Sequence, residues 1–502
     1  MKKNQKQNQK MSSPVSQFGI KYRLYAAALL CGLCVMALEL VGARMVAPHL
    51  GASIIVWTSL IGVIMASMAA GYYAGGRIAD KRPSVRLLAG FVAGAALWVV
   101  LLSFAEKGIL RLLLSGGITN IYLLSIIAAL VFFAVPGFLL AAVSPFVIKL
   151  FAADKEMIGG VAGKVSAFST VGSIAGTFLG GFILVSFFSV TVILLLIALV
   201  LCITSIIIFS VNWKSATALC LAAFGVFTGL YHIQKNLVPN MAIETMYNSL
   251  FIAEYIEDGR RVRALYTDSE KLQGRIFVDN PDEMAAEYLR FIADSYVTDN
   301  IQSVLMLGGG VYVFPRWLGT AHPDIGIDIV EIDPGITKVA RDFFYLIDRP
   351  NQHIFHEDAR YFVNRLVRET TGHYDIIFQD TYGSPFNVPF QLSTVEFFSK
   401  VHTLLSEDGV FLINFMGSID SAMFSSLYAS VKEVFPAVMV YPVNEPNDTK
   451  ALQNILLAAF KTAPVNGGNV LIAEYRVTPT NNIPAFTDAF APVERYTMMM
   501  IQ

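Results

Sequence analysis

The stretch 303-SVLMLGGGVYVFP-315 determines the fold of the second half of this sequence. A short apolar run that ends in glycines predicts a buried strand. Glycine directly after such a strand permits an unusual turn and lets a ligand approach the backbone closely. We therefore expect a ligand-binding loop here, with a plain tight turn as the alternative. The loop glycines are Gly308, Gly309 and Gly310.

The sequence around this loop alternates between short apolar runs and helical patterns. Strands are expected at 303–307, 326–331, 353–356, 374–379 and 410–414. Helices are expected at 334–344, 359–369 and 394–405. This alternation predicts an α/β Rossmann-like domain, with a parallel sheet covered by helices on both faces. Ligands of such sheets bind at the carboxyl ends of the strands.

Short alternating runs over 248–278 come before this domain and predict a small β-subdomain. A helix is expected to follow, from Pro281 through about Val297. We therefore divide the second half of the chain into a linker with the β-subdomain, 234–280, and the Rossmann-like domain, 281–502.

Three acidic residues follow predicted strands at the edge where a ligand is expected. Glu331 lies 21 residues after Gly310, where a carboxylate can accept hydrogen bonds from ribose hydroxyls; a solvated charge is the alternative. Asp358 and Ala359 stand where adenine would bind, unless the aspartate caps the next helix. Asp380 can act as a base or hold a substrate cation, with a turn-forming role as the alternative.

Two further local patterns refine this prediction. The glycines do not fit G-x-G-x-x-G, so a dinucleotide is less expected than a single nucleoside. Asp333 precedes Pro334, a pair that predicts the N-cap and the first position of the next helix.

The first half of the sequence is far more apolar than the second. The 502 residues are 55% hydrophobic and 15% charged, with a mean hydropathy of +0.56. About seven apolar segments account for the excess, and most reach the roughly 20 residues that cross a bilayer. We expect a transmembrane helical domain over 24–233, embedded in lipid, after a basic tail over 1–23. The segments are 24–46, 53–76, 86–105, 119–150, 161–187, 190–210 and 215–233.

Basic residues orient the bundle, because they concentrate on the cytoplasmic side. They cluster before the first segment, after the second and around the loop after the fourth: Lys2, Lys3, Lys6, Lys10, Lys21, Arg23, Arg77, Lys81, Arg82, Arg86, Lys149, Lys155 and Lys164. Seven crossings would then place the Rossmann-like domain outside, which conflicts with a cytoplasmic source for its expected ligand. Either 215–233 does not cross or another segment is miscounted. We expect a protein of the plasma (inner) membrane with its soluble domain in the cytoplasm.

Small and charged residues inside the apolar segments raise further expectations. Glu39 lies in the first segment, where a charge is costly and often functional. Small residues four apart predict close helix packing, with a transport path as the alternative. These are Gly172, Gly176 and Gly180. The net charge of −1 gives no case for nucleic acid as a partner.

Several blocks over roughly 245–420 resemble the spermidine synthase (aminopropyltransferase) family, in particular its membrane-fused branch. They are "VLMLGGG", "VEIDPGITKVARDFF", "EDARYFV", "YDIIFQD" and "LSTVEFFSKVHTLLSEDGVFLINF". The stretch 69-AAGYYAGGRIADKRP-83 and the layout of the first six segments resemble major facilitator transporters, although this chain has no second set of six.

The resemblance implies a fold of the spermidine synthase and methyltransferase type, and it implies roles for single residues. The substrate would be decarboxylated S-adenosylmethionine or S-adenosylmethionine itself, with no metal. Asp380 would deprotonate an attacking amine. The adenosyl group would contact Gly308, Gly309, Gly310, Glu331, Asp358 and Ala359, with Asn248 and Gln273 also reaching it.

This sequence also departs from the family pattern. Val311 stands where the family has an aspartate that faces the propylamine tail. The segment after Asp380 has one extra residue and lacks the second acid that holds putrescine. A diamine is a dication, and its desolvation requires several carboxylates. One carboxylate beside Tyr382 or Tyr312 suits a single cation, aided by cation–π contact.

Three functions follow from these patterns. The first is an enzyme that cleaves the propyl side of the cofactor and releases methylthioadenosine. Its acceptor would be an amine other than putrescine, or the cofactor's own tail by cyclisation or elimination. The second is a methyltransferase that uses S-adenosylmethionine. The third is a membrane sensor of an adenosyl ligand without catalysis. The sequence leaves the oligomeric state open, and a homo-oligomer is one state that it allows.

Overall fold

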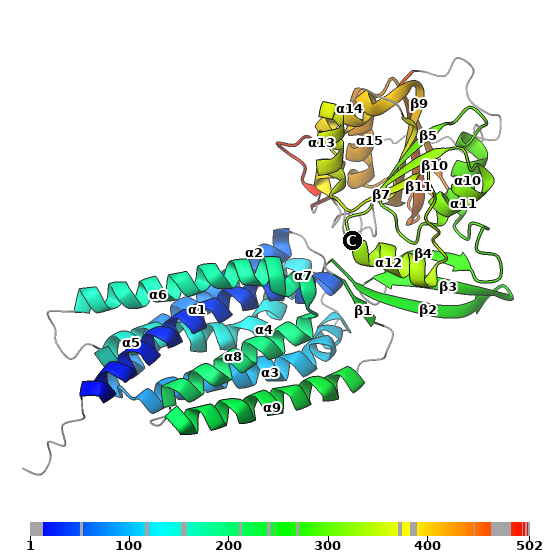
Figure 1. The fold of residues 1–502 in the computed structure, drawn as a ribbon. Helices are drawn as coiled ribbons and strands as arrows, with labels where there is room; N and C mark the ends of the chain where they lie inside the picture. Colours follow the sequence, from blue (N-terminus) through cyan, green and yellow to red (C-terminus); the bar gives the residue numbers. More distant parts are fainter. Residues whose placement is uncertain are drawn as a thin grey trace, which may run out of the picture. The chain divides into compact units, whose positions relative to one another are not determined.

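The computed structural model divides the chain into two compact units, Met1–Asn240 and Met241–Gln502 (Figure 1). Each unit is described by itself. The structure describes residues 14–50, 54–115, 120–151, 158–209, 213–237, 242–245, 247–267, 271–369, 374–381, 389–445, 447–462, 483–493, 495–496 and 499.

The first unit is a helical bundle, and its described residues include six helical segments that are long and apolar enough to cross a membrane. The helices are α1 (Pro14–Leu50), α2 (Ile54–Lys81), α3 (Val85–Ser115), α4 (Ile121–Ala141), α5 (Val143–Phe151), α6 (Ile158–Phe178), α7 (Val185–Phe187), α8 (Val190–Phe209) and α9 (Trp213–Leu237), with a π-helical turn at Leu179–Leu184. The candidate spans are Ile20–Val46, Ile54–Lys81, Val85–Glu106, Tyr122–Phe151, Ile158–Leu184 and Val190–Phe209.

The seventh predicted segment, 215–233, lies in helix α9. Among the described residues of that helix, the apolar stretch is Ala222–Ile233. Whether this segment crosses a membrane stays a prediction. The six longer segments agree with the predicted membrane domain.

Close packing between α1 and α6 explains the small residues of the fifth segment. A Cβ atom added at Gly172 would collide with the backbone oxygen of Leu29, and one added at Gly176 with that of Leu33. The two helix backbones therefore touch along this face, as the spacing predicts. Near its two ends, α1 is tied to other segments: Arg23 donates to the carbonyl of Ile207, and Arg44 to that of Val185.

The second unit begins with a four-stranded antiparallel sheet in the order β1-β2-β3-β4. Its strands are β1 (Ala242–Glu244), β2 (Ser249–Glu257), β3 (Arg260–Thr267) and β4 (Lys271–Phe277). This is the predicted β-subdomain. The helix predicted from Pro281 is shorter than expected, because α10 covers only Glu287–Tyr296. The chain before it pairs Met284 with Ile276, which keeps that segment extended.

The main sheet has seven strands in the order β10-β11-β9-β8-β5-β6-β7. Strands β5 to β9 are parallel, whereas β11 runs antiparallel to β9 and to β10. The strands are β5 (Ser303–Leu307), β6 (Gly326–Val330), β7 (Gln352–Phe355), β8 (Tyr374–Gln379), β9 (Leu405–Gly417), β10 (Ala437–Pro442) and β11 (Gln453–Phe460). The five predicted strands are confirmed, and the antiparallel pair at the edge is new.

Helices cover both faces of this sheet (Figure 1). One apolar core joins the sheet to α10, α11 (Val313–Ala321) and α12 (Pro334–Phe343). The other joins it to α13 (Ala359–Glu369), α14 (Val395–Leu404) and α15 (Ala422–Val434). Alternate residues of β5 enter opposite cores: Val304 and Met306 the first, Leu305 and Leu307 the second. This doubly covered sheet is the predicted architecture.

Candidate functional site at the carboxyl ends of the parallel strands

The glycine loop after β5 has a shape that side chains would not permit. Gly308 has a φ of +92°, and a Cβ atom there would collide with the backbone oxygen of Asp380. A Cβ atom at Gly309 would lie 2.6 Å from the ring of Tyr312. The N–H of Asp380 donates to the carbonyl of Leu307 at 2.8 Å, so the ends of β5 and β8 are held side by side. The loop therefore lies directly against Asp380.

Tyr312 and Val311 are part of the protein interior in this structure. Tyr312 has a left-handed backbone with a φ of +60°, and its side chain is fully buried beneath the loop. Its hydroxyl lies 2.7 Å from Oγ1 of Thr337. Val311 is 4% exposed and packs against the backbone of Gly274. Their predicted role in lining a substrate pocket stays a prediction, and Tyr382 lies outside the described residues.

Glu331, directly after β6, holds the backbone of the glycine loop through hydrogen bonds. Its carboxylate accepts hydrogen bonds from the N–H groups of Gly309 at 2.8 Å and Asp333 at 2.9 Å. The residue is only 6% exposed, and this burial raises the pKa of its carboxyl group, while the backbone hydrogen bonds act in the opposite direction. A buried carboxylate that fixes the loop backbone is thus in place, and its contact with a ribose remains a prediction.

Asp358 has the capping role that the sequence left open. Its Oδ1 accepts a hydrogen bond from the N–H of Tyr361 at 3.0 Å, in the first turn of α13. Ala359 begins that helix and is buried. The second carboxylate oxygen of a capping aspartate can still accept a hydrogen bond. The predicted contact with adenine is therefore compatible with the cap and stays a prediction.

Asp333 connects the β-subdomain to the main sheet. It caps α12 by accepting from the N–H of Gly335 at 2.9 Å, with Pro334 at the start of the helix, as predicted. Its other oxygen accepts from the hydroxyl of Thr245 and from Nδ2 of Asn248, the latter at 3.1 Å. Asn248 therefore links the two sheets through this hydrogen bond, and its predicted contact with the cofactor stays a prediction.

Gln273 borders the loop through its backbone. Its carbonyl oxygen lies 3.4 Å from where a Cβ atom at Gly310 would stand. Its side chain Nε2 donates to Oγ1 of Thr267 at 2.9 Å. Strand β4 thus forms one wall beside the glycine loop. Within the described parts of the chain, no group of three or more His, Cys, Asp or Glu side chains could hold a metal ion.

Asp380, directly after β8, is held by two side chains from distant elements. Its Oδ2 accepts from the hydroxyl of Tyr288 at 2.9 Å, and its Oδ1 accepts from Nδ2 of Asn414 at 2.9 Å. Asn454 extends the network by donating its Nδ2 to Oδ1 of Asn414 at 2.9 Å. Burial raises the pKa of Asp380, and the hydrogen bonds from Asn414 and Tyr288 offset part of that rise.

The pKa of Tyr288 is also raised well above its usual value, by burial and by the nearby Asp380. Its hydroxyl therefore stays protonated and donates to the carboxylate. Sequence reasoning missed Tyr288, Asn414 and Asn454. A polar residue inside the apolar run "VFLINF" was a usable signal for Asn414, because buried polar groups need partners.

Comparison with known proteins agrees with this geometry. Residues 288–464 match the family model described as spermine/spermidine synthase domain. The matched residues lie within the second half of the chain. A polyamine aminopropyltransferase of Vibrio vulnificus is 24% identical over 215 residues, which are 42% of this chain and 70% of that protein. One from Clostridium beijerinckii is 28% identical over 35% of this chain and 62% of its own length.

Methyltransferases also match this chain. An N-terminal histidine N-methyltransferase of Emericella nidulans is 36% identical over 143 residues, which are 28% of this chain and 24% of that protein. Among solved structures, a probable spermidine synthase from Corynebacterium glutamicum is 20% identical with a TM-score of 0.44, covering 51% of this chain and 99% of that one. These curated relatives are therefore transferases of two kinds.

Proposed function

We propose that the protein is a membrane-bound enzyme that cleaves the propyl side of S-adenosylmethionine or its decarboxylated form and releases methylthioadenosine. The observation that carries this proposal is Asp380. It lies against the glycine loop, and Tyr288 and Asn414 fix its two oxygens. A base must be positioned before it can act on a substrate proton, and this carboxylate is held from two sides.

In the proposed reaction an amine nitrogen attacks the propyl carbon that is bonded to the sulfonium sulfur. The new C–N bond forms as the C–S bond breaks, and the electron pair of that bond stays on sulfur. Sulfur thereby becomes a neutral thioether. The proton that the nitrogen loses goes to the carboxylate of Asp380. Its raised pKa makes Asp380 a better proton acceptor near neutral pH than an ordinary aspartate.

The acceptor is an amine other than putrescine, or the cofactor's own tail. The sequence from 381 to 391, which follows Asp380, contains no acidic residue. Val311 offers an apolar buried side chain in place of an acid. Because a dication needs more than one carboxylate for its desolvation, a pocket with a single carboxylate favours a singly charged acceptor.

We place the soluble unit on the cytoplasmic side. Six crossings return the chain to the side on which it started, whereas seven would not. The basic clusters at Arg77–Arg86 and around Lys149 then face the same side as the N-terminal lysines. This topology removes the conflict between the basic residues and a cytoplasmic cofactor, provided that α9 does not cross.

Product analysis tests the proposal. The full chain in lipid nanodiscs is incubated separately with S-adenosylmethionine and with its decarboxylated form, and the nucleoside products are identified by mass spectrometry. We expect methylthioadenosine from at least one of them, and little from Asp380→Asn. S-adenosylhomocysteine as the sole product would instead establish the second candidate, a methyltransferase, which the similarity to methyltransferases favours. Cofactor binding without turnover would indicate a sensor.

A further inference from the structure

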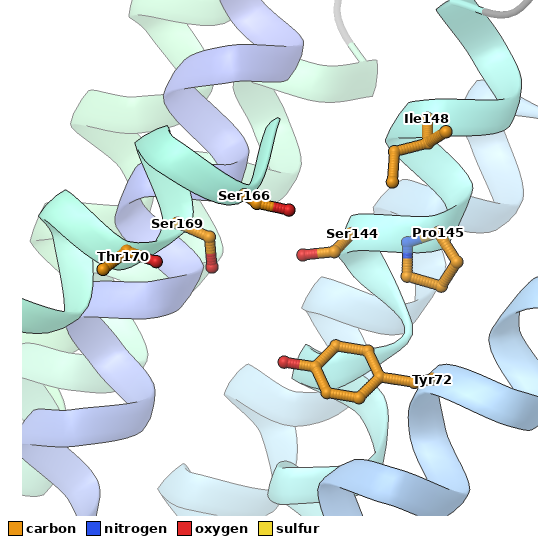
Figure 2. A pocket seen from close by; sticks show the side chains of 7 residues that line it. All are labelled: Tyr72, Ser144, Pro145, Ile148, Ser166, Ser169 and Thr170. Carbon is orange, nitrogen blue, oxygen red and sulfur yellow. The ribbon is translucent and has the colours of Figure 1, made fainter. Parts of the chain in front are cut away.

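A cavity of about 370 Å³ lies in the membrane unit, between α6 on one side and α2 and α5 on the other. Figure 2 shows hydroxyl groups pointing into it from both sides. Five of its seven lining residues carry a hydroxyl, and none is charged. They are Tyr72, Ser144, Pro145, Ile148, Ser166, Ser169 and Thr170.

These hydroxyls differ from most others in the bundle. Ser67, Thr177 and Thr204 each donate to the carbonyl four residues earlier, at 2.7, 2.9 and 2.7 Å. Within the described residues, the five hydroxyls around the cavity make no hydrogen bond to the protein. Lipid tails cannot satisfy a polar group, and each unsatisfied group in the bilayer core is costly. A polar molecule in the cavity would satisfy these hydroxyl groups.

We propose that this cavity is a binding site for an uncharged, hydroxyl-bearing small molecule of the nucleoside class. Hydroxyl groups both donate and accept hydrogen bonds, so they match a ligand with hydroxyl and amino groups. The absence of a charged lining residue disfavours an ion, whose desolvation would go uncompensated. The ring of Tyr72, with Pro145 and Ile148, supplies apolar surface for a planar base.

The lining residues show toward which end of the helices the cavity lies. Ser144 and Ile148 stand in the helix that ends at Phe151, and Ser166 follows the start of α6 at Ile158. Lys149 and Asp80 form an ion pair at 2.7 Å at the same end, and their charges offset each other. This end carries the basic clusters assigned above to the cytoplasm. The volume is within the range of about 300–1,000 Å³ typical of small-molecule sites.

The choice of a nucleoside rests on the proposed function, because that reaction leaves a neutral thioether nucleoside. A molecule of this chemistry would fit the cavity as product or as cargo. The hydroxyl-lined site itself is independent of the reaction.

Cysteine labelling tests this site. Ser169→Cys is introduced into the full chain after the native cysteines are replaced by alanine, and the protein is placed in nanodiscs. Iodoacetamide reacts with the thiolate, which forms only where water reaches it, so we expect labelling about tenfold faster than at a lipid-facing cysteine. The matched control is Val171→Cys, two residues away on α6 and 56% exposed outside the cavity lining. The replaced residues are Cys31, Cys34, Cys202 and Cys220.

Ligand protection then tests the class of molecule. Methylthioadenosine and adenosine at saturation should slow labelling of Ser169→Cys about fivefold or more, whereas spermidine and inositol should not. Equal labelling at the two positions would show a dry cavity and overturn the proposal. Labelling that no nucleoside slows, or that only spermidine slows, would overturn the ligand class. The Asp380→Asn background removes turnover, so protection there separates this site from failure of the proposed reaction.

Discussion

Glu331 and Asp380 are two carboxylates at neighbouring strand ends, and the protein holds them in different ways. Glu331 accepts hydrogen bonds from backbone N–H groups of the loop that it supports. Asp380 accepts them from the side chains of Tyr288 and Asn414. Backbone donors come with the fold itself, whereas side-chain donors can be exchanged one by one. From this difference we expect the first carboxylate to act in binding and the second in the chemistry.

The largest expected effect is that of Asp380→Asn on turnover. The amide retains the size of the carboxylate but cannot accept a proton, so we expect kcat to fall about 10²- to 10⁴-fold. Cofactor affinity should change little, because the glycine loop is untouched. Stopped-flow measurement of product release, with calorimetric binding as the control, checks both parts. An equal loss of affinity would show that Asp380 acts in binding.

Glu331→Gln should produce the opposite pattern. It weakens the acceptor for the N–H groups of Gly309 and Asp333, and we expect about a tenfold rise in cofactor Kd. The kcat at saturating cofactor should stay within a few-fold of the parent. Calorimetric titration measures the affinity. An unchanged Kd with a collapsed kcat would reverse the assignment of the two carboxylates.

The pH profile sharpens the role of Asp380. Because burial raises its pKa, the carboxylate is lost at a higher pH than for an ordinary aspartate as the solution is acidified. The acid limb of the kcat/KM profile, where activity falls as the solution is acidified, should therefore lie at a higher pH than an ordinary aspartate would give. Tyr288→Phe removes a hydrogen bond that lowers this pKa, so the acid limb of kcat/KM should move to still higher pH. Tyr361→Phe, an exposed control, should leave the limb in place.

Asn454→Ala should have the smallest effect of the series. Asn454 donates a hydrogen bond to Asn414, which in turn donates to Asp380. Removing the Asn454 side chain therefore breaks the outer hydrogen bond and leaves both partners of the carboxylate in place. We expect about a two- to fivefold fall in kcat and a small upward move of the acid limb. Steady-state kinetics across pH measure both. An effect as large as that of Asn414→Ala would mean that the outer hydrogen bond is as important as the inner one.

The local features of the site were predictable because they depend on neighbours in the sequence. Strand β5 and helix α13 lie where the apolar pattern placed them, and Asp333 caps α12 as the Asp-Pro pair indicated. The partners of Asp380 were not predictable in this way. Tyr288 is 92 residues away and Asn414 is 34 residues away. Only the folded arrangement of helix α10 and strands β8 and β9 brings them together.

Two other differences have local causes that the sequence pattern concealed. Helix α10 begins at Glu287 rather than Pro281, because a bridge between Met284 and Ile276 holds the preceding residues extended. Tyr312 is predicted to line a substrate pocket, and what the pattern did not show is that its left-handed backbone turns the ring inward to Thr337. Both outcomes depend on contacts with another strand or helix.

One paired measurement tests the division of work between the two carboxylates most directly. Cofactor Kd and the rate of methylthioadenosine release are determined for the parent, Asp380→Asn and Glu331→Gln in the same nanodisc preparation. We expect Asp380→Asn to bind the cofactor and release almost no methylthioadenosine, while Glu331→Gln binds weakly and turns over once saturated. Undiminished methylthioadenosine release from Asp380→Asn would contradict a catalytic role for this residue.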